Sequence, residues 1–200
     1  MEQTRAYIDS QIDRMIEGGL EITDREAFTN NILDFMGVVR DIESSNDNTQ
    51  VAPSTGAAGV YQFLEDSVKT ARNRAGHEES NVAHENREYV ANISENPLEW
   101  DEDQAGLMFL AHAFGAPVNK KRSPVIGSDE LFHRIGTDFD PDAQKDLYMN
   151  YHYRAIPNEA TYNRATEKIL ENYTLRFPEI SKNLGGSVTK PFYSDKRYLI

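Results

Sequence analysis

The chain lacks cysteine altogether and is short of basic side chains. Without cysteine it can form no disulfide, no thiolate metal site and no cysteine nucleophile. It holds 21 lysines and arginines against 33 aspartates and glutamates, a formal net charge of −12. Nonspecific nucleic-acid binding depends on a basic surface that neutralises phosphates, so the charge argues against nucleic acid as a partner.

Long apolar runs are also missing. No stretch approaches the ~20 apolar residues that cross a bilayer, so we expect no membrane insertion. The first sixteen residues have no basic start followed by an apolar run. We therefore expect no secretory signal peptide.

What the chain does have is helical periodicity. Two hundred residues suit one domain with short appendages. Apolar residues recur at helical spacing, and no convincing series of strands is present. We expect an all-α or mainly α fold, with an N-terminal helical extension over 1–20, the main domain over 21–177 and an extended tail over 178–200.

The expected helices follow from apolar stripes and from capping residues. The first covers 2–17, and the second opens at Thr23 or Asp24 and ends near Glu43. A third runs from Gly59 or Val60 to about Arg74. Residues 75–96 are very polar and predict an irregular insertion or a solvated helix. Later helices are expected over 101–114, 130–135 and about 141–154, with a last long one from 158 or 159.

The helix over 101–114 is apolar all round, which is typical of a central core helix. The apolar stripe of the second helix, in contrast, ends beside a carboxylate. Glu43 follows Val39 by four residues, so it lies on or beside the buried face. A carboxylate in that place is costly unless it is paired or opens into a cleft.

A polar loop follows, and then a turn of small residues. Residues 54–59 read Ser-Thr-Gly-Ala-Ala-Gly, and Tyr-Gln-Phe comes at 61–63. Glycines in such a turn let the backbone approach a ligand closely.

Cleavage of a glycosidic bond needs a proton donor at the leaving oxygen. A glutamate can supply the proton where partial burial raises its pKa toward neutrality.

These two motifs resemble the lytic transglycosylase and goose-type lysozyme family. Its signature is a Glu-Ser pair followed by a Gly-Ala-x-Gly-Leu-Met-Gln turn. Here the pair is Glu43 and Ser44, and the turn reads Gly-Ala-Ala-Gly-Val-Tyr-Gln at 56–62. The resemblance implies that Glu43 is the general acid and then the base. It also implies that Ser44 and Gln62 orient the acid and the sugar, and that Gly59 and Tyr61 line the cleft.

A third, looser match lies near the C-terminus. Residues 147–152 read Leu-Tyr-Met-Asn-Tyr-His, and the family places a tyrosine hydroxyl beside its catalytic glutamate in a similar element. The resemblance gives that role to Tyr151. Large residues stand before Tyr151 where the family has small ones, and the glycine usually found soon after it is missing.

The resemblance covers about residues 26–172. It implies a lysozyme-like fold for the main domain and cleavage of the bond between N-acetylmuramic acid and N-acetylglucosamine in peptidoglycan. Its partners would be peptidoglycan glycan strands, with no cofactor and no metal. Together with the missing signal and the acidic charge, it suggests a phage protein with other virion proteins as further partners. We expect it in the virion, or in the host periplasm or cell wall after delivery.

Plainer interpretations stand beside these. Glu43 alone could be a solvated glutamate at a helix end, the glycine turn an ordinary helix cap, and Tyr151 a core tyrosine. The whole chain could be a catalytically inactive lysozyme-fold component of a phage tail or internal virion assembly that is structural or binds glycan. It could also be a helical interaction protein without a glycan site. The histidines of His77-Glu78 and His84-Glu85 lack the spacing of a zinc protease, so they are more simply a solvated charge cluster.

Overall fold

The computed structural model describes residues 1–76, 84–114, 128–138 and 167. Among them the secondary structure is helical, and pairing of extended backbone is confined to two isolated bridges, Val51 with Ala58 and Ala58 with Phe63. The expected mainly α fold is therefore confirmed over these residues. The helices are α1 (Glu2–Glu17), α2 (Arg25–Ser44), α3 (Glu65–Gly76), α4 (His84–Asn92), the short 3-10 helix η1 (Pro97–Glu99), α5 (Glu102–Phe114) and α6 (Ser128–Asp138).

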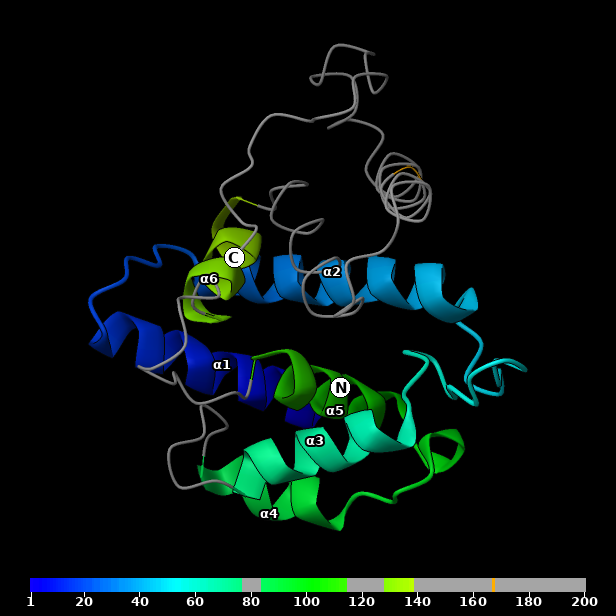
Figure 1. Cartoon of the computed structure of the whole chain (residues 1–200). Coiled ribbons are helices and arrows are strands. Elements are labelled where there is room, and N and C mark those ends of the chain that lie inside the picture. The colour runs from blue at the N-terminus through cyan, green and yellow to red at the C-terminus, as the bar shows by residue number, and fades with distance from the viewer. Residues whose placement is uncertain (77–83, 115–127, 139–166, 168–200) are drawn as a thin grey trace, which may run out of the picture.

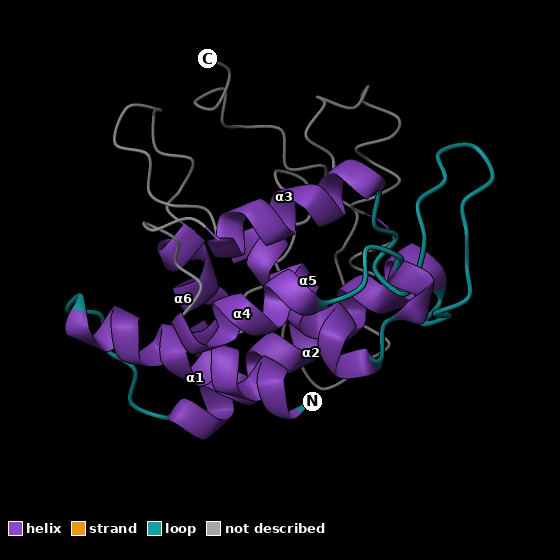
Figure 2. Ribbon diagram, turned by 90° about the horizontal axis from the view of Figure 1, so that it is seen from below, coloured by secondary structure: helices purple, strands orange, loops and turns teal. Residues whose placement is uncertain are grey.

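Helix α5 occupies the centre of the described molecule. It contacts α1, α3, α4 and α6, and Figures 1 and 2 show these helices arranged around it. Asp101 and Gln104 start it reciprocally: the Asp101 carboxylate accepts the Gln104 N–H at 2.8 Å, and the Gln104 side chain accepts the Asp101 N–H at 3.1 Å. Leu107, Met108 and Leu110 are fully buried. The prediction of a central core helix is confirmed.

Helix α1 also forms where the spacing predicts it, and it packs on α5 and α2. Its contact with α5 is close at Gly106, where an added Cβ would stand 2.8 Å from the Thr4 hydroxyl. Asp103 of α5 caps the start of α1, because its carboxylate accepts the N–H groups of Gln3 at 2.9 Å and Thr4 at 2.8 Å. The first helix is thus fastened to the central one at its N-terminus.

Helix α2 begins as predicted at the N-cap Asp24, whose carboxylate accepts the Ala27 N–H at 2.9 Å. Its predicted apolar stripe is buried throughout: Phe28, Ile32, Phe35, Met36, Val39 and Ile42. Figure 1 shows α2 running along one side of the molecule, with α6 crossing it near the N-terminal end. Glu43, which follows this stripe, therefore lies near the C-terminal end of a helix whose apolar face is buried.

Helix α3 starts later than the sequence predicts. We expected it from Gly59 or Val60, but it begins at Glu65. Gly59 has φ of 74° and Gln62 has φ of 50°, and a right-handed helix cannot include either conformation. Residues 59–62 instead form a turn closed by the bridge between Ala58 and Phe63.

Helix α6 runs to Asp138, past the predicted end at residue 135. Gly136 lies inside the helix, and the Phe28 ring packs so closely against it that an added Cβ would clash with the ring. The Asn31 amide also donates to the Gly136 carbonyl at 2.8 Å. Gly136 therefore serves the packing of α6 on α2.

The polar stretch 75–96 contains the helix α4, whose Val90 is fully buried. The prediction for this stretch was an irregular insertion or a solvated helix; over residues 84–92 it is a helix with a buried face, and residues 77–83 lie outside the described residues. Apart from Glu167, which is helical, the helices expected after residue 140 lie outside the described residues, as do the tail over 178–200 and Tyr151. Across the part that is described, no helix is long and apolar enough to cross a membrane.

Candidate functional site

Glu43 lies in the last turn of α2 and is partly buried. The helix ends directly after it because Ser45 and Asn46 both take the left-handed conformation, with φ of 54° and 63°. Their N–H groups bond back to the carbonyls of Asp41 at 3.1 Å and Arg40 at 3.2 Å. The chain turns sharply here, so Glu43 is held at a fixed place on the helix end.

The neighbouring serine joins the two sequence motifs. Ser44 is buried, and its Oγ lies 2.9 Å from the carbonyl oxygen of Val60 and 3.2 Å from that of Arg40. It also accepts the Asp47 N–H at 3.1 Å. A hydroxyl has a single proton, so it donates to one carbonyl at a time. The hydroxyl is thus engaged by backbone, and its contact with the acid or the sugar stays a prediction.

The glycine turn, residues 56–62, needs its two glycines for different reasons. Gly56 and Gly59 share φ of 74°, a conformation that other residues rarely adopt. Around Gly56 there is open space, whereas an added Cβ at Gly59 would stand 3.0 Å from the Pro97 carbonyl oxygen. The close backbone approach expected at Gly59 is therefore made, within the described residues, to the segment that leads into α5.

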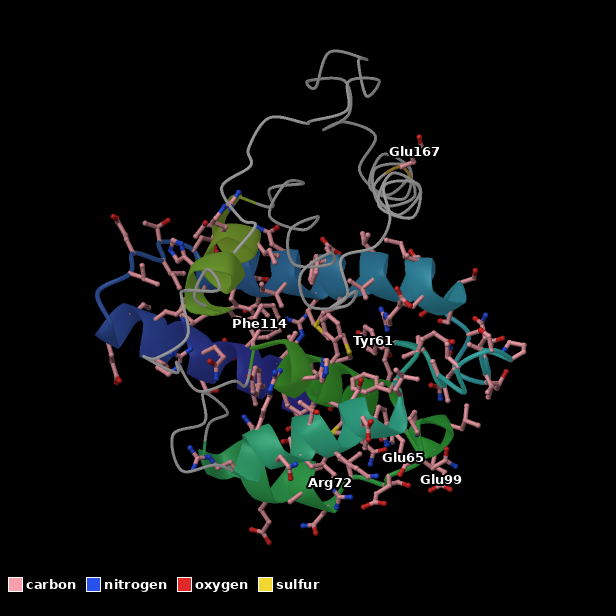
Figure 3. All side chains as sticks on the ribbon, viewed as in Figure 1. Tyr61, Glu65, Arg72, Glu99, Phe114 and Glu167 are labelled. Atoms are coloured by element: carbon pink, nitrogen blue, oxygen red, sulfur yellow. The ribbon has the colours of Figure 1, made fainter. Side chains whose placement is uncertain are left out.

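Tyr61 anchors this turn on the central helix. Its ring stacks on Phe109 with centroids 4.6 Å apart and planes 16° apart, and the side chain is 3% exposed. Burial raises the pKa of Tyr61 well above its ordinary value, so the phenol stays neutral. Figure 3 shows Tyr61 between α2 and α5. A ring packed in this way supports the turn from inside; a role in lining the cleft stays a prediction.

Gln62 holds the turn from its other end. With φ of 50° it is one of three non-glycine residues at positive φ in the described chain, and the other two are Ser45 and Asn46. Its amide donates to the carbonyls of Gly59 at 2.9 Å and Gln50 at 3.2 Å. The predicted bond from Gln62 to the glutamate or to an N-acetyl group is not tested by these contacts.

Two residues of this region were not singled out from the sequence. Arg40 lies one helical turn before Glu43 and pairs with Glu102 of α5, with 2.6 Å between Nη1 and Oε1. Asn48, in the loop after α2, bonds to backbone of both the glycine turn and the segment before α5. Arginine and asparagine are common in such places, and their partners are distant in sequence, so no local pattern could have found them.

The structure thus places the turn that holds Gly59, Tyr61 and Gln62 against Ser44 at the C-terminal end of α2, and Glu43 precedes Ser44 in the same turn of the helix. Tyr151 lies outside the described residues. In the described part of the chain no three histidines, aspartates or glutamates are grouped so that they could hold a metal ion. Comparisons with models of known protein families, with curated proteins and with solved structures each find no match to this chain. The resemblance to transglycosylases therefore depends on the motifs and on how they lie.

Proposed function

We propose that the protein cleaves the glycosidic bond between N-acetylmuramic acid and N-acetylglucosamine in peptidoglycan, with Glu43 as its acid. One observation carries the proposal. The Glu-Ser pair and the glycine turn, which the resemblance makes parts of one site, are joined directly by the bond between the Ser44 hydroxyl and the Val60 carbonyl. A chance coincidence of two short motifs would not require them to meet.

The strained backbone supports the same place. The non-glycine residues at positive φ in the described chain are Ser45, Asn46 and Gln62, directly after Glu43 and inside the glycine turn. Such conformations cost of order 1–3 kcal/mol each and gather at functional sites, where the surrounding structure holds them. At Ser45 and Asn46 the left-handed conformation also ends α2, as in an ordinary helix cap, so the more telling of the three is Gln62, inside the glycine turn.

The proposed reaction needs one carboxyl group that acts first as a general acid and then as a general base. Protonated Glu43 gives its proton to the leaving glycosidic oxygen, and the bond from that oxygen to the anomeric carbon breaks. The carboxylate then takes a proton from the nucleophile that closes on the anomeric carbon. If the nucleophile is the 6-hydroxyl of the same sugar, the product is a 1,6-anhydro sugar. If the nucleophile is water, the glycosidic bond is hydrolysed and the product carries a hydroxyl at the anomeric carbon. Either route returns Glu43 to its starting state.

In this proposal the turn presents backbone and Gln62 to the sugar, and Ser44 keeps the turn beside the acid. Tyr151 supplies a hydroxyl near Glu43, as the resemblance implies. The biological setting that we propose is a phage-encoded protein that opens the cell wall from the virion. Glycan strands and other virion proteins are its partners there.

Digestion of purified sacculi by the wild-type protein tests the proposal, with the released fragments identified by mass spectrometry. We expect disaccharide fragments cut after N-acetylmuramic acid. Fragments lighter than the hydrolysis products by one water would identify a transglycosylase, and hydrated fragments a lysozyme. A folded protein that releases nothing, and only sediments with the sacculi, would be the inactive glycan-binding component instead.

A further inference from the structure

The backbone of Val60 is held by side chains on both of its polar groups. Its carbonyl oxygen lies 2.9 Å from the Ser44 hydroxyl, and its N–H donates to the Asn48 Oδ1 at 3.3 Å. Both side chains come from the five residues that follow Glu43. The centre of the glycine turn is therefore placed by the same short segment that carries the acid.

Asn48 extends this connection to the central helix. Its Nδ2 donates to the carbonyl oxygen of Trp100 at 2.9 Å, directly before the residues that cap α5. The same stretch lies against the turn at Gly59, where an added Cβ would stand only 3.0 Å from the Pro97 carbonyl oxygen. One amide thus joins three segments: the loop after α2, the glycine turn and the segment leading into α5.

A link of this kind matters because the joined segments lack a regular ladder of their own. The loop after Glu43 and the turn are irregular, and among described residues their only extended pairing is the two isolated bridges. Scattered backbone bonds, such as that from the Gly59 N–H to the Gln50 carbonyl at 3.0 Å, tie the loop to the turn, and the side-chain bonds of Asn48 add the link to the segment before α5. A reacting group displaced by about 1 Å can cost on the order of 100-fold in rate.

We propose that Asn48 is a positioning residue that holds the glycine turn at its working distance from Glu43. Its effect on catalysis depends on the proposed function, while its effect on the turn does not. Asn48 acts through Val60 and Trp100 and needs no contact with the sugar. The side chain uses both of its functions here, an acceptor toward Val60 and a donor toward Trp100, so no residue with one function replaces it.

The test compares Asn48→Ala and Asn48→Asp with the wild type and with the control Asn92→Ala. The control removes the hydrogen bond from the Asn92 side-chain amide to the Glu88 carbonyl within α4. The kinetic measurement is release of fragments from soluble glycan strands. The structural measurements are hydrogen exchange at the Val60 amide and emission of Trp100, the only tryptophan in the chain. Trp100 packs edge-on to Phe63 at 5.1 Å, so its emission reports on the place where turn and segment meet.

We expect Asn48→Ala to lower kcat by about 10- to 100-fold with a smaller change in KM, to speed exchange at Val60 and to shift Trp100 emission. Asn48→Asp keeps the acceptor but places a carboxylate oxygen against the Trp100 carbonyl. Its activity relative to wild type should rise as the pH falls and the introduced carboxyl gains a proton to donate. Asn92→Ala should match the wild type in every measurement.

Wild-type kcat and KM in a folded Asn48→Ala, or unchanged Val60 exchange, would overturn the role of Asn48 and leave the proposed function standing. A wild type that releases no fragments would overturn the proposed function. In that case the Val60 exchange still decides whether Asn48 holds the turn: faster exchange supports it and unchanged exchange refutes it.

Discussion

The core around α5 and the segment from Ser44 to Phe63 are held together in opposite ways. Core residues such as Leu107 and Leu110 lie on regular helices and are excluded from water, and glycines at 106 and 136 let neighbouring helices approach closely. The segment from Ser44 to Phe63 is irregular and has three non-glycine residues at positive φ among those described. It is held by scattered backbone bonds and by side chains that bond to backbone.

This difference implies that the core determines the stability of the fold and that the irregular segment determines where the candidate site residues lie. Burial of apolar side chains supplies most of the free energy of folding. A single hydrogen bond contributes only about 1 kcal/mol net but fixes a direction. We therefore expect core substitutions to act mainly on stability, and substitutions in the irregular segment to act mainly on activity.

The largest effect on stability should come from the core. Leu110→Ala in α5 removes a fully buried side chain and leaves a cavity, so we expect it to lower the free energy of unfolding by about 2–5 kcal/mol. The matched control is Leu98→Ala, because Leu98 is 40% exposed, and it should stay within about 0.5 kcal/mol. Urea unfolding measures both. Equal losses in the two variants would refute the central place given to α5.

The two glycines of the turn allow a finer comparison. They share φ of 74°, so alanine at either place carries a left-handed strain of about 1–2 kcal/mol. Gly59→Ala also pushes its Cβ against Pro97, and we expect a total loss of about 2–3 kcal/mol together with loss of glycan cleavage. Gly56→Ala should lose about 1 kcal/mol and keep its activity, because the space around it is open. Urea unfolding and fragment release measure the pair, and variants that behave alike would contradict the contact with Pro97.

The smallest effect should come from the cap that joins α1 to α5. Burial works to raise the pKa of Asp103, but hydrogen bonds from Thr4 and Gln3 outweigh it and hold that pKa below the ordinary value. A depressed pKa means that the stabilisation is complete above the ordinary value of 3.8 and is lost as the pH falls through the folded value.

We therefore expect Asp103→Ala to cost about 1 kcal/mol at neutral pH and to flatten the acid limb of a stability–pH curve. Asp9→Asn, which changes an exposed carboxylate of α1, serves as the control. Thermal unfolding between neutral and strongly acidic pH gives both curves. An Asp103→Ala curve parallel to that of the wild type would show that the cap contributes nothing.

Much of the core could be predicted from the sequence, because apolar spacing reports directly on a buried helix face. The stripes of α1, α2 and α5 are buried as predicted, and only Ile16 at the end of α1 is largely exposed, at 42%. The predicted start of α3 was wrong because residues 60–63 are apolar enough to belong to a helix. The left-handed backbone conformation of Gln62 cannot be recognised from the amino-acid sequence. The predicted end of α6 was wrong because Gly136, just after it, stays helical and packs against Phe28, a residue far away in the sequence.

The candidate site was predictable only in its outline. The sequence predicts that Glu43 ends a helix and that a glycine turn follows, and both are confirmed. The stack of Tyr61 on Phe109 and the bond from Asn48 to Trp100 depend on residues that only folding brings together. The roles of these residues toward a sugar remain proposals.

One measurement tests the central claim most directly: sacculus digestion by Glu43→Gln beside its matched control Asp41→Asn. Both variants replace a carboxylate by an amide of the same shape on the last turn of α2, and both should unfold like the wild type. We predict that Glu43→Gln releases no fragments, because an amide cannot give a proton to the leaving oxygen, whereas Asp41→Asn digests the wall. Digestion by Glu43→Gln at the wild-type rate would contradict the role of Glu43.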